Sequence, residues 1–239
     1  MRFIYHLVKS VRIRVTCAAV FVVAIALIVP QAARAQFLHP KITSKQTTIR
    51  NVVLLPAKVE IVKQGMKGPE GMAAESDLLS ARVTQLVTEA LATKHITAST
   101  GPASRAGEGE GQQKYTVADI QSRYDALLPK IRKQRKDMKK GRFSLGDEVL
   151  NLNLDKNADA IVFIRGQGQK LTKGKTAFTI LVGGLPAYFQ LTIGIVDAHT
   201  GEVLLYTDAL MRGDATSENE KPLRKAIEKS FKKLPAVAP

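Results

Sequence analysis

The chain has 239 residues, a formal net charge of +15 and a single cysteine, Cys17. One cysteine excludes a disulfide within the chain and any site built from several thiolates. The length suits one domain with its own hydrophobic core.

The first 35 residues predict a secretory signal peptide. A basic leader without acidic residues precedes an apolar run of 13 residues, 17–29, which ends at Pro30, and Ala-Arg-Ala follows at 33–35. A helix that spans a bilayer needs roughly 20 apolar residues, so we expect export and cleavage before Gln36. The alternative is an uncleaved membrane anchor, which also leaves the rest of the chain outside the cytoplasm, in the periplasm or at the envelope.

The position of Cys17 and the distribution of charge both change the interpretation of the exported part. Cys17 precedes the apolar run, whereas a lipoprotein carries its cysteine after it, so we expect neither lipidation nor a thiolate site in the mature chain. Removing residues 1–35 lowers the net charge to +10, of which residues 130–142 contribute +7. We call this segment the basic arm; its cations are Lys130, Arg132, Lys133, Arg135, Lys136, Lys139, Lys140 and Arg142.

The first half of the exported chain predicts a short N-terminal extension, 36–47, before the domain starts. A β-branched and apolar run predicts a buried strand over 48–56, which ends at a proline. A glycine-rich loop follows, and apolar residues at helical spacing predict a helix from Glu75 onward. A short strand at 95–99 and a mobile loop at 101–113 complete this half.

The second half begins with a basic helical section, 116–142, in which Pro129 predicts a break near 125–129. A helix at 144–157 and a strong strand at 158–169 follow. An apolar hairpin at 191–210 and a closing helix with Leu223, Ile227 and Phe231 on one face end the chain. Together these elements predict a single α/β domain over 48–235: a mixed β-sheet flanked by helices, with a C-terminal β-hairpin and closing helix.

The polar corner of the hairpin has two interpretations. Asp197, His199 and Glu202 could act as acid, base or ligand, but a nucleophile needs a base and an orienting group within reach, and no further motif supplies them. The second interpretation is a turn, in which Asp197 bonds backbone amides ahead of it, Thr200 is part of the turn, and Gly201 takes a positive φ. We favour the turn.

Other patterns point away from catalysis. The three histidines beyond the signal peptide, His39, His95 and His199, lack metal-ligand spacing. The glycines of 166–169 lack the third glycine of a dinucleotide fingerprint, and residues 174–176 lack the upstream glycine of a Walker motif. We therefore predict no catalytic, cofactor or metal site, and a protein that is not an enzyme.

Two segments are candidates for contact with other molecules. The basic arm is either an anion contact, for anionic lipid, lipopolysaccharide or nucleic acid, or a solvated helix end. Nucleic acid ranks last, since export removes the protein from it and no aromatic residue interleaves the run. The apolar run at 178–191 either packs in the core or forms an exposed partner contact through Leu181, Leu185, Tyr188 and Phe189.

Three segments carry a resemblance to known proteins: VVLLP at 52–56, ADAIVFIRGQGQ at 158–169 and GIVDAHTGEVLLY at 194–206. In these segments the chain resembles the curli-secretion lipoprotein family, the outer-membrane lipoprotein activators of penicillin-binding proteins, and related bacterial lipoproteins. The resemblance implies a mixed sheet flanked by helices and non-catalytic work in envelope assembly or regulation. The missing lipidated cysteine departs from the pattern and puts outer-membrane tethering in doubt.

These observations lead to two functional hypotheses. The first is a non-enzymatic secreted or periplasmic envelope protein that acts in assembly or regulation by binding a partner protein or by self-association. The alternative is a peripheral module that binds anionic lipid or polyanion through the basic arm.

Overall fold

The computed structural model describes most of the chain that follows the predicted signal peptide. The described residues are 35–65, 68–101, 117–146, 149, 157–172, 176, 179 and 187–238. The predicted signal peptide up to residue 34, nearly all of the predicted mobile loop and most of the predicted helix at 144–157 lie outside these ranges. Among the described residues, no helix is long and apolar enough to cross a membrane.

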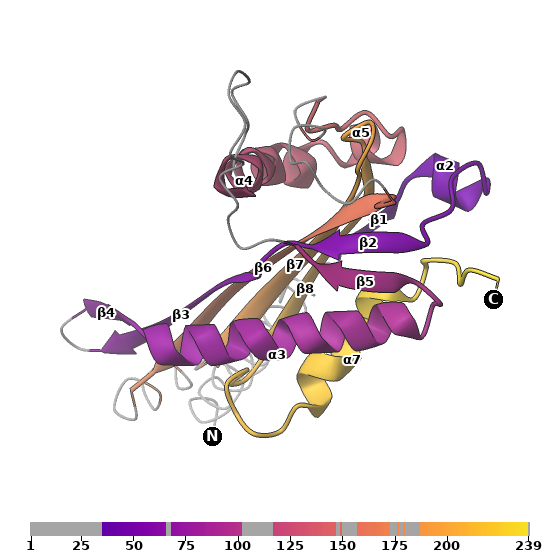
Figure 1. Ribbon diagram of the computed structural model, residues 1–239. Coiled ribbons are helices and arrows are strands. Elements are labelled where there is room, and N and C mark those ends of the chain that lie inside the picture. Colours follow the sequence, from indigo (N-terminus) through magenta and orange to yellow (C-terminus); the bar gives the residue numbers. More distant parts are fainter. Residues whose placement is uncertain are drawn as a thin grey trace, which may run out of the picture. The chain divides into compact units, whose positions relative to one another are not determined.

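The predicted α/β class is confirmed: an open mixed sheet is flanked by helices, and a hairpin and a helix end the chain (Figure 1). The strand order is β1-β8-β7-β6-β2-β5, with β3 also paired to β6 and β4 paired to β3. The strands are β1 (Ala35–Leu38), β2 (Asn51–Leu54), β3 (Lys58–Gly65), β4 (Gly68–Gly71), β5 (Thr97–Thr100), β6 (Ala160–Leu171), β7 (Ala187–Asp197) and β8 (Val203–Arg212).

Strand β6 is the axis of the sheet because it pairs in parallel with both β2 and β3. Its first residues, Ala160 to Ile164, are fully buried, as expected for a strand that is covered on both faces. Between β2 and β3, Pro56 lacks an amide hydrogen for the ladder. The prediction of a loop after Pro56 is wrong, since buried Val59 and Ile61 alternate with exposed residues, which is the pattern of a half-buried strand.

Residues 36–47, predicted as an N-terminal extension, contribute to the sheet and the core. Strand β1 pairs antiparallel with β8, from Ala35 opposite Asp208 to Leu38 opposite Leu205. The short helix α2 (Pro40–Thr43) follows and buries Ile42. The sequence patterns did not predict this pairing, because a strand of four residues at the edge of the sheet shows little periodicity.

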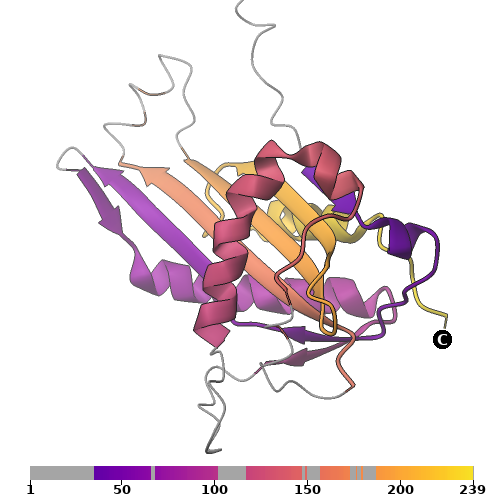
Figure 2. The same cartoon turned by 90° about the horizontal axis from the view of Figure 1, so that it is seen from above.

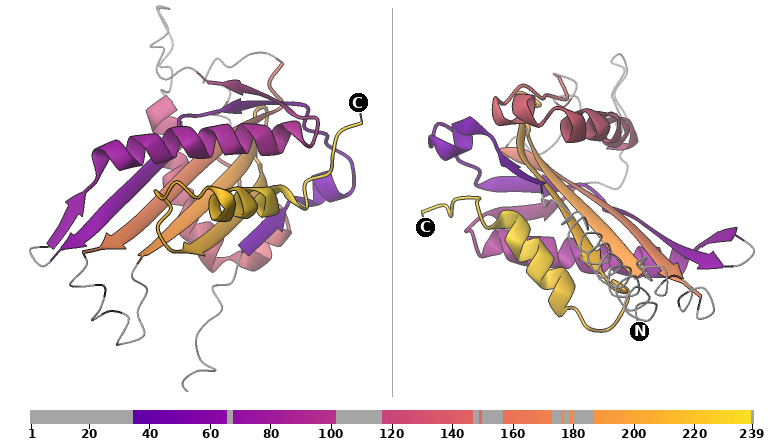
Figure 3. Two further views of the ribbon diagram at one scale, coloured as in Figure 1. Left: turned by 90° about the horizontal axis from the view of Figure 1, so that it is seen from below. Right: turned by 180° about the vertical axis from the view of Figure 1, so that it is seen from behind.

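One face of the sheet is covered by α3 (Ala73–Ala92) and α7 (Lys221–Phe231), which lie side by side (Figure 3). Their buried residues join one continuous apolar cluster with β6, β7 and β8. The helical stripe predicted from Leu79 to Ala90 is the buried face of α3. Charged contacts between the two helices stay at the outer surface, such as Arg224 with Glu89 at 2.5 Å.

The opposite face is covered by α4 (Val117–Lys133) and α5 (Arg135–Lys139). Tyr124 of α4 stacks on Phe163 of β6 at 4.3 Å between ring centroids, directly over Gly194, where a Cβ would overlap the tyrosine ring. Pro129 lies inside α4, so the predicted break comes later than expected, at Gln134. Figure 2 shows that α4 crosses the sheet obliquely. On the side of α4 away from α5, where β3 and β6 end, no described element covers this face of the sheet.

Candidate functional site

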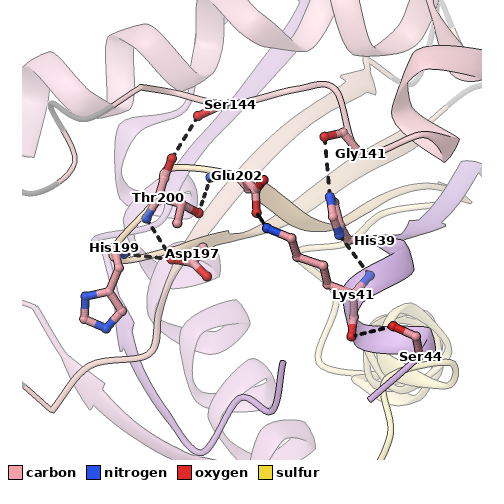
Figure 4. A network of polar contacts seen from close by, with 9 residues as sticks. All are labelled: His39, Lys41, Ser44, Gly141, Ser144, Asp197, His199, Thr200 and Glu202. Atoms are coloured by element: carbon pink, nitrogen blue, oxygen red, sulfur yellow. Dashed lines mark hydrogen bonds and ion pairs between the residues drawn. The ribbon is translucent and has the colours of Figure 1, made fainter. Parts of the chain in front are cut away.

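The hairpin corner is a hydrogen-bonded turn (Figure 4). The carboxylate Oδ1 of Asp197 accepts hydrogen bonds from the backbone amides of His199 and Thr200, both at 2.8 Å. Gly201 has a φ of +69°, a left-handed conformation that costs glycine least. The hydrogen-bonded turn by itself therefore explains why Asp197 and Gly201 occupy these positions.

The three acid and base candidates of this corner do not converge on one point. Glu202 pairs with Lys41 at 2.5 Å, on the side of α2. The carboxylate of Asp197 is occupied by the turn, and the exposed ring of His199 points away from both in Figure 4. Among the described residues, no group of three or more His, Cys, Asp or Glu side chains could hold a metal ion.

His39 is the one buried histidine in the described chain, and its contacts are structural. Its Nδ1 accepts the backbone amide of Lys41 at 3.1 Å and so caps α2. Its Nε2 lies 3.4 Å from the carbonyl oxygen of Gly141, at the end of the basic arm. The histidine therefore ties the N-terminal segment to the arm.

The described cations of the basic arm divide into those with an acidic partner and exposed lysines without one. Arg132 points toward the sheet, and Arg142 pairs with Asp137 at 3.4 Å. Buried Met138 anchors α5 in the core, while the side chain of Arg135 lies outside the description. The exposed cations, none with an acidic partner among the described residues, are Lys130, Lys133, Lys136, Lys139 and Lys140.

Of the apolar run at 178–191, the structure describes residue 179 and residues 187–191. Leu181 and Leu185 lie outside the described residues. Phe189 is fully buried against Gly166 and Gly168, where added Cβ atoms would approach its ring to 2.6 and 3.1 Å. Phe189 is therefore a core residue and not an exposed contact, and the close packing of its ring explains both glycines. Tyr188, on the other face of β7, is partly exposed.

A row of polar residues that the sequence patterns did not predict crosses the sheet beneath α4. The register places Lys58 of β3 opposite Arg165 of β6, Arg165 opposite Thr192 of β7, and Thr192 opposite Asp208 of β8. We call these four residues the polar row. Alternating polar residues in β6 and β7 hinted at a solvated face, but the alignment of the strands depends on the register.

Helix α4 places one acid and one base over opposite ends of the polar row. Asp125 pairs with Arg165 and lies 3.7 Å from Lys58. Arg132, two helical turns later on the same side, lies 3.5 Å from Asp208. Each charged residue of the polar row therefore lies close to a residue of opposite charge on α4.

The Asp208 carboxylate, with 17% of its side chain exposed, is the most richly bonded group of the row. It accepts hydrogen bonds from Gln190 at 2.8 Å, from Thr192 at 3.4 Å and from Tyr206 at 3.4 Å. Burial and the nearby Asp208 charge raise the pKa of Tyr206. Desolvation opposes the charge of Arg132, but its hydrogen bond to Tyr206 and the Asp208 charge outweigh it and raise the pKa of Arg132.

A groove of about 360 Å³ opens between α4 and the part of the sheet that no described element covers. One wall is the α4 surface around Leu128 and Pro129, and the floor is the sheet. We call it the polar groove; its other lining residues are Lys58, Glu60, Asp125, Arg132, Arg165, Gly166, Gln167, Gln190 and Thr192.

Comparisons with known proteins find no match among protein-family models or curated proteins. Among solved structures, a PelC dodecamer from Paraburkholderia phytofirmans is 12% identical, covers 86% of this chain and 99% of that chain, and has a TM-score of 0.41. Lipoprotein GNA1162 from Neisseria meningitidis is 10% identical, with coverages of 76% and 94% and a TM-score of 0.29. The LpoB C-terminal domain from Salmonella enterica is 9% identical, with coverages of 72% and 93% and a TM-score of 0.25. With every TM-score below 0.5, the proposals below rest on the chain's own residues.

Proposed function

We propose that this protein is a non-enzymatic, exported envelope protein that binds a partner protein, or a second copy of itself, through the polar groove and the uncovered sheet face beside it. The observation that carries the proposal is the contrast between the two faces of the sheet. One face packs against α3 and α7 over an apolar cluster, whereas the other presents a polar surface next to α4.

Features of the groove favour binding over chemistry. The charged residues of the polar row pair with Asp125 and Arg132 of α4, an arrangement that positions a helix rather than placing a free base beside a nucleophile. The groove also lies on strands, which hold side chains more precisely than loops do. Export is supported by the signal-peptide pattern of residues 1–35.

Site-specific crosslinking in the native cells tests this proposal. A photoreactive amino acid replaces Gln167 on the groove floor in one variant, and Gln85 on the exposed side of α3 in the matched control. We expect a reproducible envelope protein, or a ladder of the protein's own oligomers, from the Gln167 position alone. Equal products from both positions, or none in the envelope fraction, would contradict the proposal.

A second candidate function is peripheral binding to anionic lipid through the basic arm. The specific observation is the group of five exposed lysines from Lys130 to Lys140, held on an anchored helical segment. Clustered lysines contribute about 1 kcal/mol each near an anionic bilayer surface.

Vesicle flotation tests the second candidate. Charge reversal of Lys136 and Lys139 should abolish flotation with anionic vesicles, and the same reversal of Lys225 and Lys229 on α7 serves as the control. Binding should fall steeply as salt rises. Flotation that is indifferent to salt, or lost equally in both variants, would contradict it.

A further inference from the structure

The free hydrogen-bonding groups of the polar groove lie on three neighbouring strands. The register aligns Glu60 of β3, Gln167 of β6 and Gln190 of β7 in one cross-strand line beside the polar row. In the described structure, the side chains of Glu60 and Gln167 have no protein partner, and Gln190 donates only its Nε2, to Asp208. Each glutamine amide combines a donor with an acceptor, so the line can pair with peptide groups.

Cations outnumber acids around this line: Lys58, Arg132 and Arg165 line the groove, against Glu60 and Asp125. Lys58 is half-exposed, and the Arg132 side chain is 42% exposed. The hydrogen bonds of Arg132 use its Nε and Nη2, which leaves the donors of Nη1 for another acceptor. The exposed lysines of the basic arm lie on both sides of Arg132 in the chain and add positive charge at and beyond the end of α4.

We infer that the polar groove binds an extended, acidic peptide segment of a partner protein. This inference rests on the proposed function and names the chemistry of the partner. One carboxylate of the segment accepts from Nη1 of Arg132, another is attracted by Lys58 at the other end of the row, and the peptide groups pair with Gln167 and Gln190. The basic arm steers the segment toward the groove, as complementary charge does at other interfaces.

Glu60 gives the inference an internal test, because it is the one acid in this line. Its carboxylate repels an acidic segment, so Glu60→Gln should strengthen binding. Gln167→Glu places a new negative charge on the adjacent strand and should weaken binding. Gln85→Glu on α3 makes the same charge change on the opposite face and is the matched control.

The measurement is the fluorescence anisotropy of labelled hexaglutamate and hexaglutamine peptides with the protein purified from the envelope of cells that produce the full chain. We expect hexaglutamate to bind at least about tenfold more tightly than hexaglutamine, and Gln167→Glu to weaken it about fivefold or more. Gln85→Glu should change the affinity by less than about twofold. Hydrogen exchange with bound hexaglutamate should show protection in β6 and β7.

Other outcomes overturn the inference in distinguishable ways. Equal effects of Gln167→Glu and Gln85→Glu on the affinity, or protection from hydrogen exchange confined to α5, would contradict the inference. Either result would show that hexaglutamate is held by the positive charge of the basic arm and not by the groove. No peptide binding at all, with a crosslinked partner still captured at Gln167 in cells, would refute the acidic peptide and leave the proposed function standing. If neither peptide binding nor a crosslinked partner at Gln167 is observed, the groove is not a binding site and both proposals fail.

Discussion

The two covers of the sheet are held by different physical means. Helices α3 and α7 rest on an apolar cluster, with charged pairs only at their outer edges. Helix α4 combines apolar contacts at Tyr124 and Ile131 with the polar row beneath Asp125 and Arg132. Apolar burial is non-directional, whereas charged pairs require one register, so α4 is the cover whose position is specified most closely.

This difference separates stability from recognition. The α3 and α7 face buries large side chains, and charged pairs between the two helices lie at its outer surface. The α4 face leaves part of the sheet uncovered and presents oriented polar groups beside a groove. We expect substitutions on the first face to change mainly the stability of folding, and substitutions at the groove to change binding.

The largest effect is expected from the apolar cover. Phe231→Ala removes a fully buried ring of α7 and should lower the free energy of unfolding by about 3–5 kcal/mol. Urea denaturation measures the change, and hydrogen exchange should rise across the whole domain. A loss below 1 kcal/mol would show that α7 contributes little to the core.

A smaller, more local effect is expected at the polar row. Asp208→Ala leaves Arg132, Gln190 and Tyr206 without their shared acceptor and should cost about 2 kcal/mol. Hydrogen exchange should rise mainly in α4. A double-mutant cycle with Arg132→Gln measures the coupling, and additive losses would refute the idea that the pair positions the helix.

Tyr124→Phe tests the buried hydroxyl of the α4 cover. The Tyr124 hydroxyl is buried without a hydrogen-bond partner, so its removal should leave stability within about 1 kcal/mol, neutral or improved. Burial raises the pKa of Tyr124 above its ordinary value of 10.0. Because the unfolded chain loses this proton first, stability should fall as pH rises above about 10, and less so in Tyr124→Phe. Urea titrations from pH 8 to 11 measure this; identical pH dependence in both proteins would contradict it.

The smallest effect is expected at the hairpin corner. His199→Ala should change stability by less than about 0.5 kcal/mol, because the ring is exposed and makes no hydrogen bond in the described structure. Gly201→Ala, two residues away, should destabilise measurably, since its φ is positive and the backbone of Gly146 lies against it. A cellular phenotype of His199→Ala in a stably folded protein would reopen the enzyme hypothesis.

Much of the architecture was accessible from local patterns. The helical stripe of α3, the apolar strand β6, the hairpin of β7 and β8, and the closing helix α7 were predicted from periodicity alone. Periodicity failed where elements were short or interrupted: β1 and β4 have four residues each, and Pro56 divides one strand path into β2 and β3.

The class of fold, the position of the basic arm and the turn at Asp197 and Gly201 could be predicted from the amino-acid sequence, because each depends on residues near one another in the chain. The three-dimensional arrangement was needed to show that Arg132 pairs with Asp208 of the polar row, that Phe189 is a core residue, and that Gln167 and Gln190 face one groove. These facts depend on which strands pair and in which register, and a shift of one residue would turn every side chain of a strand to the other face.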